Sequence, residues 1–525
     1  MTGFVVLSRV LRVPYPVFLV VGGLVLSFVP GLPSVELPPD LVLLIFLPPL
    51  LYSAAFFSSP SDLKANLRPI ALLSVGLVLL TSVTVAVVGH MIVGLSWPAA
   101  FVLGVVVSPT DPVAVAATAE RFGMPRRVVA ILEGESLIND GTALVLYRTA
   151  VAAVVIGSFS IFQAGLDLVL SSIGGAVIGL AAGWLISRVR MWVEDPLVET
   201  TIALFTGYAA YIPAEELGAS GVLAVVAAAL YLSLLSPRMT SPRNRLQTFD
   251  VLEVMDFLLN SVLFILVGLQ LPAIFGEISG ESPATLAFYA ALVSLAVVGT
   301  RLLWTFLMFY LPRIFSRRLR ERYPAPPWQE VTIVAYAGMR GAVSLAIALS
   351  LPFTTESGTR FPGVTVLEPF PGRDLIIFLT FCVILVTLVL QGFSLPFIVH
   401  RLGMGFDEEE EHEEIEARLR TTQAALKKIE ELKGKEWVHE NAAERMRELY
   451  EYRRERFSAR YADQHEGGKE DGYEERSAAY QRFRREVLGE ERAALLRLRS
   501  EGSISDKVLR RVERDLDLEE ARLEI

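Results

Sequence analysis

The chain has 525 residues, 53% of them hydrophobic, and a mean hydropathy of +0.48. These values exclude an ordinary soluble protein of this length and indicate a membrane protein with many spans. The net charge of −9 comes largely from acidic clusters near the C-terminal end, and no basic motif with interleaved aromatic residues favours a nucleic-acid partner. The apolar runs end near residue 405, so we predict a transmembrane domain over 1–405 and a charged helical tail over 406–525.

Cysteine and histidine usage argues against a metal centre or a cofactor. The single cysteine, Cys382, excludes a disulfide within the chain. The histidines are five in number and scattered, so no His cluster is predicted. Residues 1–16 have neither a charged start nor a small-residue cleavage site, and no cleavable signal peptide is predicted.

Apolar runs predict most of the chain to be transmembrane helix, because a span needs about 20 apolar residues and these runs are too continuous for barrel strands. A short stub over 2–11 comes first, and counting it gives thirteen segments. The twelve longer helices are predicted at 13–29, 38–58, 68–94, 98–119, 125–157, 160–187, 197–214, 218–235, 248–271, 284–312, 330–352 and 374–399.

Loop charges test this assignment, because loops on the cytoplasmic side carry an excess of Lys and Arg. With the tail in the cytoplasm, the loops predicted outside carry only Arg360 and Arg373. The loops predicted inside carry Arg9, Arg12, Lys64, Arg68, Arg121, Arg126, Arg127, Arg188, Arg190, Arg238, Arg243, Arg245, Arg313, Arg317, Arg318, Arg320 and Arg322. This asymmetry supports both the spans and the orientation.

The predicted helix 98–119 contains two prolines, Pro109 and Pro112, on either side of Thr110 and Asp111. Proline removes a backbone donor and clashes with the preceding turn, so the helix should break here. Transporters build ion sites near the membrane midplane from such breaks. The sequence therefore predicts an ion site; a simple proline kink, with Asp111 capping the second half-helix, is the alternative.

The next predicted helix carries Glu135, Ser136, Asn139 and Asp140 within six positions. Residues four apart lie on the same side of a helix, so these side chains share one broad face. Burial disfavours the charged form of an unpaired carboxylate. Asp140 can therefore hold a proton or a small cation, but not easily both, and this competition suffices for exchange. For Glu135 and Asn139, a buried network that only locks two helices together is an alternative.

A third polar position is Arg340, which lies in the predicted span 330–352 between Gly338 and Gly341. The glycines predict a second loosened helix. A buried arginine needs an anion, and we predict Glu135 as its partner. Further ionisable residues are interpreted as lying near helix ends, with their charges at the membrane surface: Arg148, Glu199, Glu253, Asp256 and Arg301.

Together these segments resemble the cation:proton antiporter-1 family, the bacterial NhaP-type sodium/proton antiporters related to animal sodium/proton exchangers. The resemblance covers essentially the whole predicted membrane domain. It runs in order through LPPLLYSAAF (47–56), SPTDPVAV (108–115), ESLINDGTALV (135–145), AEELGASGVLAVV (214–226), LNSVLFILVGLQL (259–271) and GMRGAVSLA (338–346). It implies an all-α, thirteen-helix antiporter fold with inverted repeats, two broken helices that cross, and a dimer interface.

The resemblance also implies a role for each motif residue. Asp140 would be the carboxylate that carries the ion and the proton, and Asn139 would stabilise the crossing. The sodium site would comprise Asp140, Asp111, Thr110 and Ser136, with Thr110 contributing through its carbonyl. Glu135 and Arg340 would form a structural ion pair. In this family an asparagine before the key aspartate accompanies electroneutral one-for-one exchange, so Asn139 implies that stoichiometry.

The resemblance thus implies an antiporter that exchanges sodium or lithium for protons by alternating access, with no cofactor. It would be a homodimer in the lipid of a bacterial cytoplasmic membrane. Two departures from the family are Ser53, where many relatives have an acidic residue, and the short first segment. Potassium in place of sodium is an alternative. The tail would serve regulation or assembly, or be a solvated helical appendage.

Other classes of protein fit the sequence less well. An intramembrane aspartyl protease would pair Asp111 with Asp140, but the Gly-x-Gly-Asp motif is missing from the residues before Asp140. An intramembrane serine protease would need glycine where this chain has Ile138. A channel would need a continuous polar lining, whereas these polar residues gather at one depth, as alternating access requires.

Overall fold

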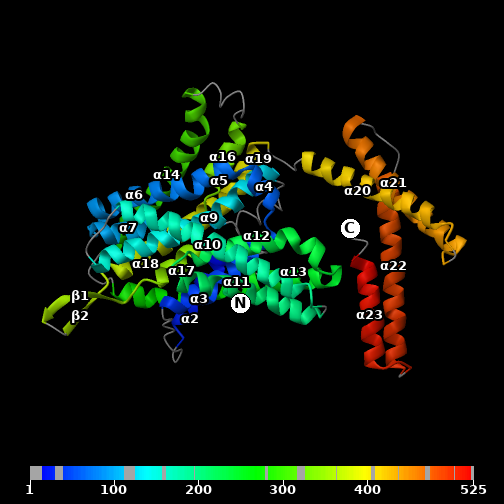
Figure 1. Ribbon diagram of the computed structural model, residues 1–525, viewed down its shortest axis with the longest axis horizontal. Helices are drawn as coiled ribbons and strands as arrows, with labels where there is room; N and C mark the ends of the chain where they lie inside the picture. Colours follow the sequence, from blue (N-terminus) through cyan, green and yellow to red (C-terminus); the bar gives the residue numbers. More distant parts are fainter. Residues whose placement is uncertain are drawn as a thin grey trace. The chain divides into compact units, whose positions relative to one another are not determined.

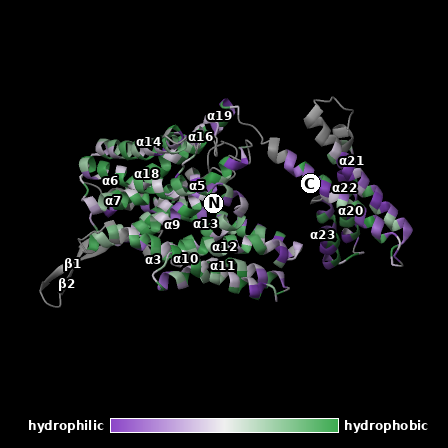
Figure 2. Ribbon diagram, turned by 45° about the horizontal axis from the view of Figure 1, so that its top comes forward, coloured by the Kyte–Doolittle hydropathy of each residue, from purple (hydrophilic) through white to green (hydrophobic). Residues whose placement is uncertain are grey.

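The computed structural model describes residues 15–29, 39–111, 124–156, 161–193, 195–277, 282–315, 326–361, 364–403, 408–435, 437–466, 473–501 and 503–521. The chain separates into two compact units, Met1–Phe406 and Asp407–Ile525. Their boundary adjoins the composition change near residue 405. Colouring by hydropathy shows the difference: the first unit is mostly apolar and the second is dominated by hydrophilic residues (Figure 2).

The first unit is a bundle of helices (Figure 1). Its α-helices are α2 (Tyr15–Ser27), α3 (Pro39–Phe57), α4 (Pro60–Ala65), α5 (Leu67–Ala71), α6 (Val78–Val88), α7 (Trp97–Val106), α9 (Arg126–Ile156), α10 (Ile161–Arg190), α11 (Pro196–Glu216), α12 (Gly221–Met239), α13 (Pro242–Glu277), α14 (Pro283–Phe315), α16 (Trp328–Tyr336), α17 (Ala342–Leu349), α18 (Arg373–Val386) and α19 (Gly392–Arg401). Three wider π-helical turns continue these helices: η1 (Leu72–Leu77), η2 (Gly89–Val93) and η3 (Thr387–Gln391).

These helices follow the predicted apolar runs closely, and six of them are long and apolar enough to cross a membrane within the described residues. Two predicted spans are interrupted. The helix predicted at 98–119 ends at Val106, and the span predicted at 330–352 is divided into α16 and α17 by residues 337–341. The stub at 2–11 lies outside the described residues, so the count of thirteen segments stays a prediction.

Packing within the first unit defines two groups of helices. In one group α2 packs on α13, α10, α11 and α12 pack on one another, and α11 and α12 also pack on α3. In the other group α14 contacts α6, α16 and α18, while α7 packs between α6 and α9. Helices α9 and α17 also contact α3 of the first group. The junction between the groups is therefore formed by α3, α9, α13 and α17.

One small sheet was not predicted from the sequence. Strand β1 (Thr354–Phe361) pairs antiparallel with β2 (Val364–Pro369) in the connection between α17 and α18. The hairpin projects from the first unit (Figure 1). Its two strands contain several threonine and valine residues, whose branched side chains favour extended backbone. Within the described residues, the bundle itself contains no strand.

Where the structure describes it, the second unit has four charged helices, α20 (Glu408–Leu432), α21 (Glu440–Glu466), α22 (Tyr473–Ser500) and α23 (Asp506–Ala521). Helices α22 and α23 lie side by side (Figure 1) around a small leucine core that includes Leu488, Leu495 and Leu509. Arg492 of α22 bridges Asp517 at 2.5 Å and Glu520 at 2.6 Å. The predicted helical character of the tail is therefore confirmed.

Candidate functional site

The first break lies at residues 107–111, where α7 ends and the prolines prevent a regular helix. Val106 is the last helical residue, and Thr110 is buried with 6% of its surface exposed. The Thr110 carbonyl accepts a hydrogen bond from the Ser136 hydroxyl. The Thr110 hydroxyl donates to Glu135 at 3.2 Å and accepts from Asn139 at 2.8 Å. The two predicted motifs therefore meet, and three side chains of α9 hold the unwound segment.

The second break, at residues 337–341, crosses the first. The Asp111 amide donates to the Met339 carbonyl at 2.8 Å, and the Asp111 carboxylate accepts from the amide of Ala342 at 3.2 Å. Asp111 thus caps the first turn of α17, where the helix dipole favours a negative charge. A methyl group on Gly341 would lie 1.6 Å from the Asp111 carboxylate. Glycine at this position leaves room for the Asp111 side chain against the start of α17.

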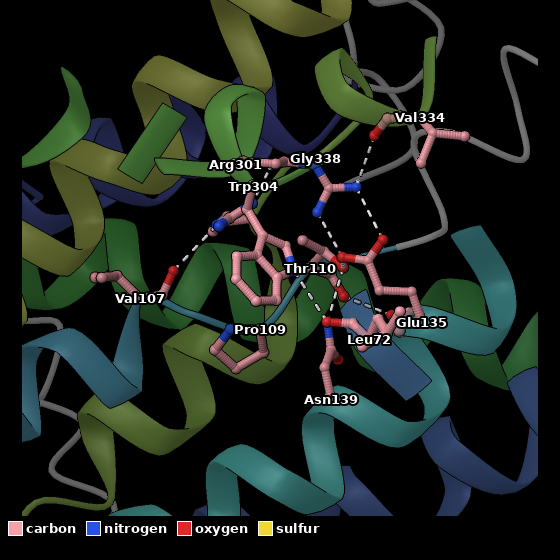
Figure 3. A network of polar contacts seen from close by, with 12 residues as sticks. Leu72, Val107, Pro109, Thr110, Glu135, Asn139, Arg301, Trp304, Val334 and Gly338 are labelled. Carbon is pink, nitrogen blue, oxygen red and sulfur yellow. Dashed lines mark hydrogen bonds and ion pairs between the residues drawn. The ribbon is translucent and has the colours of Figure 1, made fainter. Parts of the chain in front are cut away.

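Glu135 forms its ion pair with Arg301, not with Arg340, so the predicted pairing was wrong. Arg301 of α14 donates to the two Glu135 oxygens at 2.5 and 2.9 Å, and also to the Val334 carbonyl at 2.9 Å (Figure 3). Both side chains are 1% exposed. Arg301 lies mid-helix, so the prediction that its charge reaches the membrane surface was also wrong. A methyl group on Gly338 would collide with it.

Arg340 binds backbone carbonyl groups instead of a carboxylate. Its side chain donates to the Val107 carbonyl at 3.0 Å and to the Gly338 carbonyl, and its amide donates to Thr387 at 3.2 Å. These carbonyls follow the last turns of α7 and α16, where a positive charge complements the helix dipole. Each break therefore contributes the charged residue that caps a half-helix of the other: Asp111 caps α17, and Arg340 caps α7.

A cavity of about 50 Å³ lies beside this crossing, at the junction of the two helix groups. Its polar lining is Thr110, Asp111, Ser136, Asp140, Asp256 and Asn260; Leu50, Leu51 and Ala54 of α3 close one side. Asp140 is 4% exposed, and its Oδ1 atom has no hydrogen-bond partner among the described residues. The cavity thus contains every residue of the predicted sodium site, with an unsatisfied carboxylate oxygen at a buried position.

Asp256 and Asn260 are the polar residues of this cavity that the sequence analysis missed. Asp256 had been interpreted as lying near a helix end, yet α13 carries it into the cavity opposite Asp111 and Asp140. Asn260, one turn later, donates to its carboxylate at 3.2 Å and fixes its orientation. The spacing of Asp256 and Asn260 was visible in the sequence as a polar pair on one helical face. Ser53 is buried but is not among the cavity's lining residues.

The other residues interpreted as lying near helix ends divide into two kinds. Arg148 pairs with Glu215 in a partly exposed contact, and Glu253 is exposed, as expected. Glu199 is instead buried: it accepts from Arg190 at 2.8 Å and from Asn244 at 2.5 Å. This second buried pair lies between α10, α11 and α13, away from the residues of the cavity.

Residues 112–119, the predicted second half of the first broken helix, lie outside the described residues. Two non-helical segments at helix ends that cross beside a buried carboxylate, in a bundle of apolar helices, are typical of secondary transporters. Comparison with known proteins identifies the group within that class. The family model for "sodium/hydrogen exchanger, transmembrane" matches residues 1–401. The chain therefore belongs to the sodium/hydrogen exchanger family, a family of multi-pass membrane transporters, and the resemblance drawn from the motifs is confirmed.

Individual relatives extend this result. An uncharacterised Na⁺/H⁺ exchanger of Mycobacterium tuberculosis is 37% identical over 99% of this chain and 93% of its own length. A sodium, potassium, lithium and rubidium/H⁺ antiporter of Bacillus subtilis is 34% identical over 74% of this chain and 58% of its own length. The solved structure of the sodium proton antiporter MjNhaP1 from Methanocaldococcus jannaschii has a TM-score of 0.57 at 20% identity, covering 75% of this chain and 94% of that one. This structural likeness supports the antiporter fold.

Proposed function

We propose that the chain exchanges sodium, or lithium, for protons across a membrane, and that Asp140 carries the exchanged species. The observation that supports this proposal most directly is the unpartnered Oδ1 atom of buried Asp140, in a cavity with further oxygen ligands. Carboxylate, hydroxyl and carbonyl oxygens are suitable ligands for a hard cation. A bare carboxylate at this depth is costly, so Asp140 favours either a bound cation or a proton.

The cation site in this proposal comprises Asp140, Asp111, Ser136 and Thr110, with Asp256 as an additional acidic residue. Asp111 is held at the start of α17, and Ser136 is held by its bond to the Thr110 carbonyl. When the cation leaves, a proton on Asp140 restores neutrality. Asn139 is neutral and donates to Thr110, so it adds no second titrating charge, which supports one-for-one, electroneutral exchange.

Alternating access in this proposal is a movement of one helix group against the other. The cavity lies at their junction, with α3 and α13 from one group and α9, α17 and the first break from the other. A bound cation or proton would neutralise the junction and permit this movement, whereas a charged empty site would oppose it. We further propose a homodimer in a bacterial cytoplasmic membrane, with the second unit in the cytoplasm.

The test is dissipation of a pH gradient by purified protein in liposomes on addition of sodium, lithium or potassium. The native chain should respond to sodium and lithium, and Asp140→Asn should show no exchange while eluting from size exclusion like the native protein. Glu253→Gln, which removes an exposed carboxylate of α13 that does not line the cavity, is the matched control and should keep full exchange. A response to potassium alone would replace the proposed cation. Full exchange by Asp140→Asn would refute the role of Asp140.

A further inference from the structure

A second cavity of the first unit is separate from the cation site. It has a volume of about 400 Å³ and lies where the start of α5, the start of α9 and the end of α14 come together. Its size falls in the range of pockets that bind small molecules or headgroups. Four of its lining residues are basic, Lys64, Arg68, Arg127 and Arg313, and none of its described lining residues is acidic.

Three of these guanidinium groups lie close enough together to repel one another. Arg68 and Arg127 are close enough to Arg313 to repel its charge. The nearest compensation for Arg127 is Glu330, at 3.7 Å in a contact that is 45% exposed on the arginine side. An exposed pair of this kind contributes little. Lys64, Arg68 and Arg127 are exposed to solvent, so their charges are accessible to a ligand.

Apart from Asn66, the rest of the lining is apolar, and exposed apolar residues border it. Leu67 and Leu72, which line the cavity, are 56% and 37% exposed. On α14, Leu311 and Ile314 beside the cavity are 42% and 72% exposed. The Leu72 carbonyl also accepts a hydrogen bond from the Trp304 indole at 3.0 Å, which holds α14 against the first turn of η1. A basic pocket bordered by exposed leucine and isoleucine suits a ligand with a phosphate and an apolar chain.

We propose that this pocket binds the phosphate headgroup of an anionic membrane lipid, with its acyl chains against the exposed apolar residues of α5 and α14. Basic pockets between membrane helices on the cytoplasmic side recognise such headgroups. The four basic residues belong to the loops and helix ends predicted to face the cytoplasm. This site is independent of cation exchange and would exist even if the proposed function were wrong.

The experiment compares the melting temperature of full-length protein in detergent as phosphatidylglycerol, phosphatidylcholine or inorganic phosphate is added. Phosphatidylglycerol should raise the melting temperature of the native chain, and phosphatidylcholine should not. In Arg68→Gln/Arg313→Gln, the apparent affinity for phosphatidylglycerol should fall roughly thirtyfold, because each basic residue near a lipid surface contributes about fivefold. Lys64→Gln, at an exposed position, provides a second and milder variant with a fall of about fivefold.

The matched control is Arg188→Gln/Arg238→Gln, which removes two exposed arginines from loops predicted on the same side but outside the pocket. It should keep the native affinity. An equal loss in the control, or no stabilisation of the native chain, would overturn the proposal. Stabilisation by inorganic phosphate through the same residues would assign the pocket to a soluble phosphate and overturn the lipid assignment. Should the double variant not fold, an unchanged affinity in Lys64→Gln would count against the pocket.

Discussion

Two buried ion pairs lie among the described residues of the first unit, and they differ in what surrounds them. Arg190 and Glu199, with Asn244, form a closed cluster in which one acidic residue faces one basic residue. The pair of Glu135 and Arg301 lies at the crossing of the two breaks, which also contains Arg340. The cavity beside this crossing is lined by three further carboxylates, those of Asp111, Asp140 and Asp256. The crossing and its cavity thus hold more carboxylates than guanidinium groups. A buried polar cluster with balanced charge can be purely structural, whereas an excess of carboxylate requires a bound cation or proton.

Removing the arginine from each pair should produce the largest effects. The two variants distinguish a loss of stability from a loss of cation exchange. Arg301→Gln and Arg190→Gln each leave a buried glutamate with a single remaining partner, Thr110 or Asn244. Each should lower the free energy of unfolding by about 3–5 kcal/mol, measured as a fall in melting temperature. Only Arg301→Gln should also impair cation exchange in the fraction that remains folded. Equal loss of exchange per folded molecule in Arg190→Gln would show that the two clusters do not differ as described.

Gly341→Ala tests the closeness of the crossing itself. The new methyl group would lie 1.6 Å from the Asp111 carboxylate, so the two breaks must separate, at a cost of about 1–3 kcal/mol. We expect a lower melting temperature and a loss of exchange. Gly299→Ala on α14, where nothing lies within 4 Å of the new atom, is the control and should behave as the native chain. Normal exchange in Gly341→Ala would contradict the capping role of Asp111.

Asp256→Asn should have the smallest effect. It tests whether the Asp256 carboxylate contributes to cation binding. It preserves the shape of the side chain and its neighbour Asn260, but removes one negative charge from the cavity. We expect the KM for sodium to rise roughly tenfold, equivalent to about 1.4 kcal/mol, with the maximal rate retained. Initial rates in liposomes over a range of sodium concentrations measure both quantities. An unchanged KM would mean that Asp256 does not attract the cation.

Much of this arrangement was predictable from local patterns, and the exceptions share a cause. Hydropathy located the helices, and prolines and glycines located both breaks, because these signals act within one segment. The partner of Glu135 was misassigned because Arg301 and Arg340 are both arginines in apolar spans, and only packing decides which one reaches it. Asp256 was missed for the same reason, since its depth depends on how α13 meets α3 and α17. The hairpin β1–β2 lies in a loop without strong periodicity.

The reciprocal capping of the breaks has a consequence for biosynthesis. Asp111 and the amide that it caps are 231 positions apart in the chain, and Arg340 and the carbonyl of Val107 are 233 apart. At 5–20 residues per second, a ribosome needs roughly 10–50 seconds to make the intervening chain. During that interval the first break is already synthesised while the residues that complete it are not. A chaperone or insertase that shelters an unfinished polar segment would be most needed in that window.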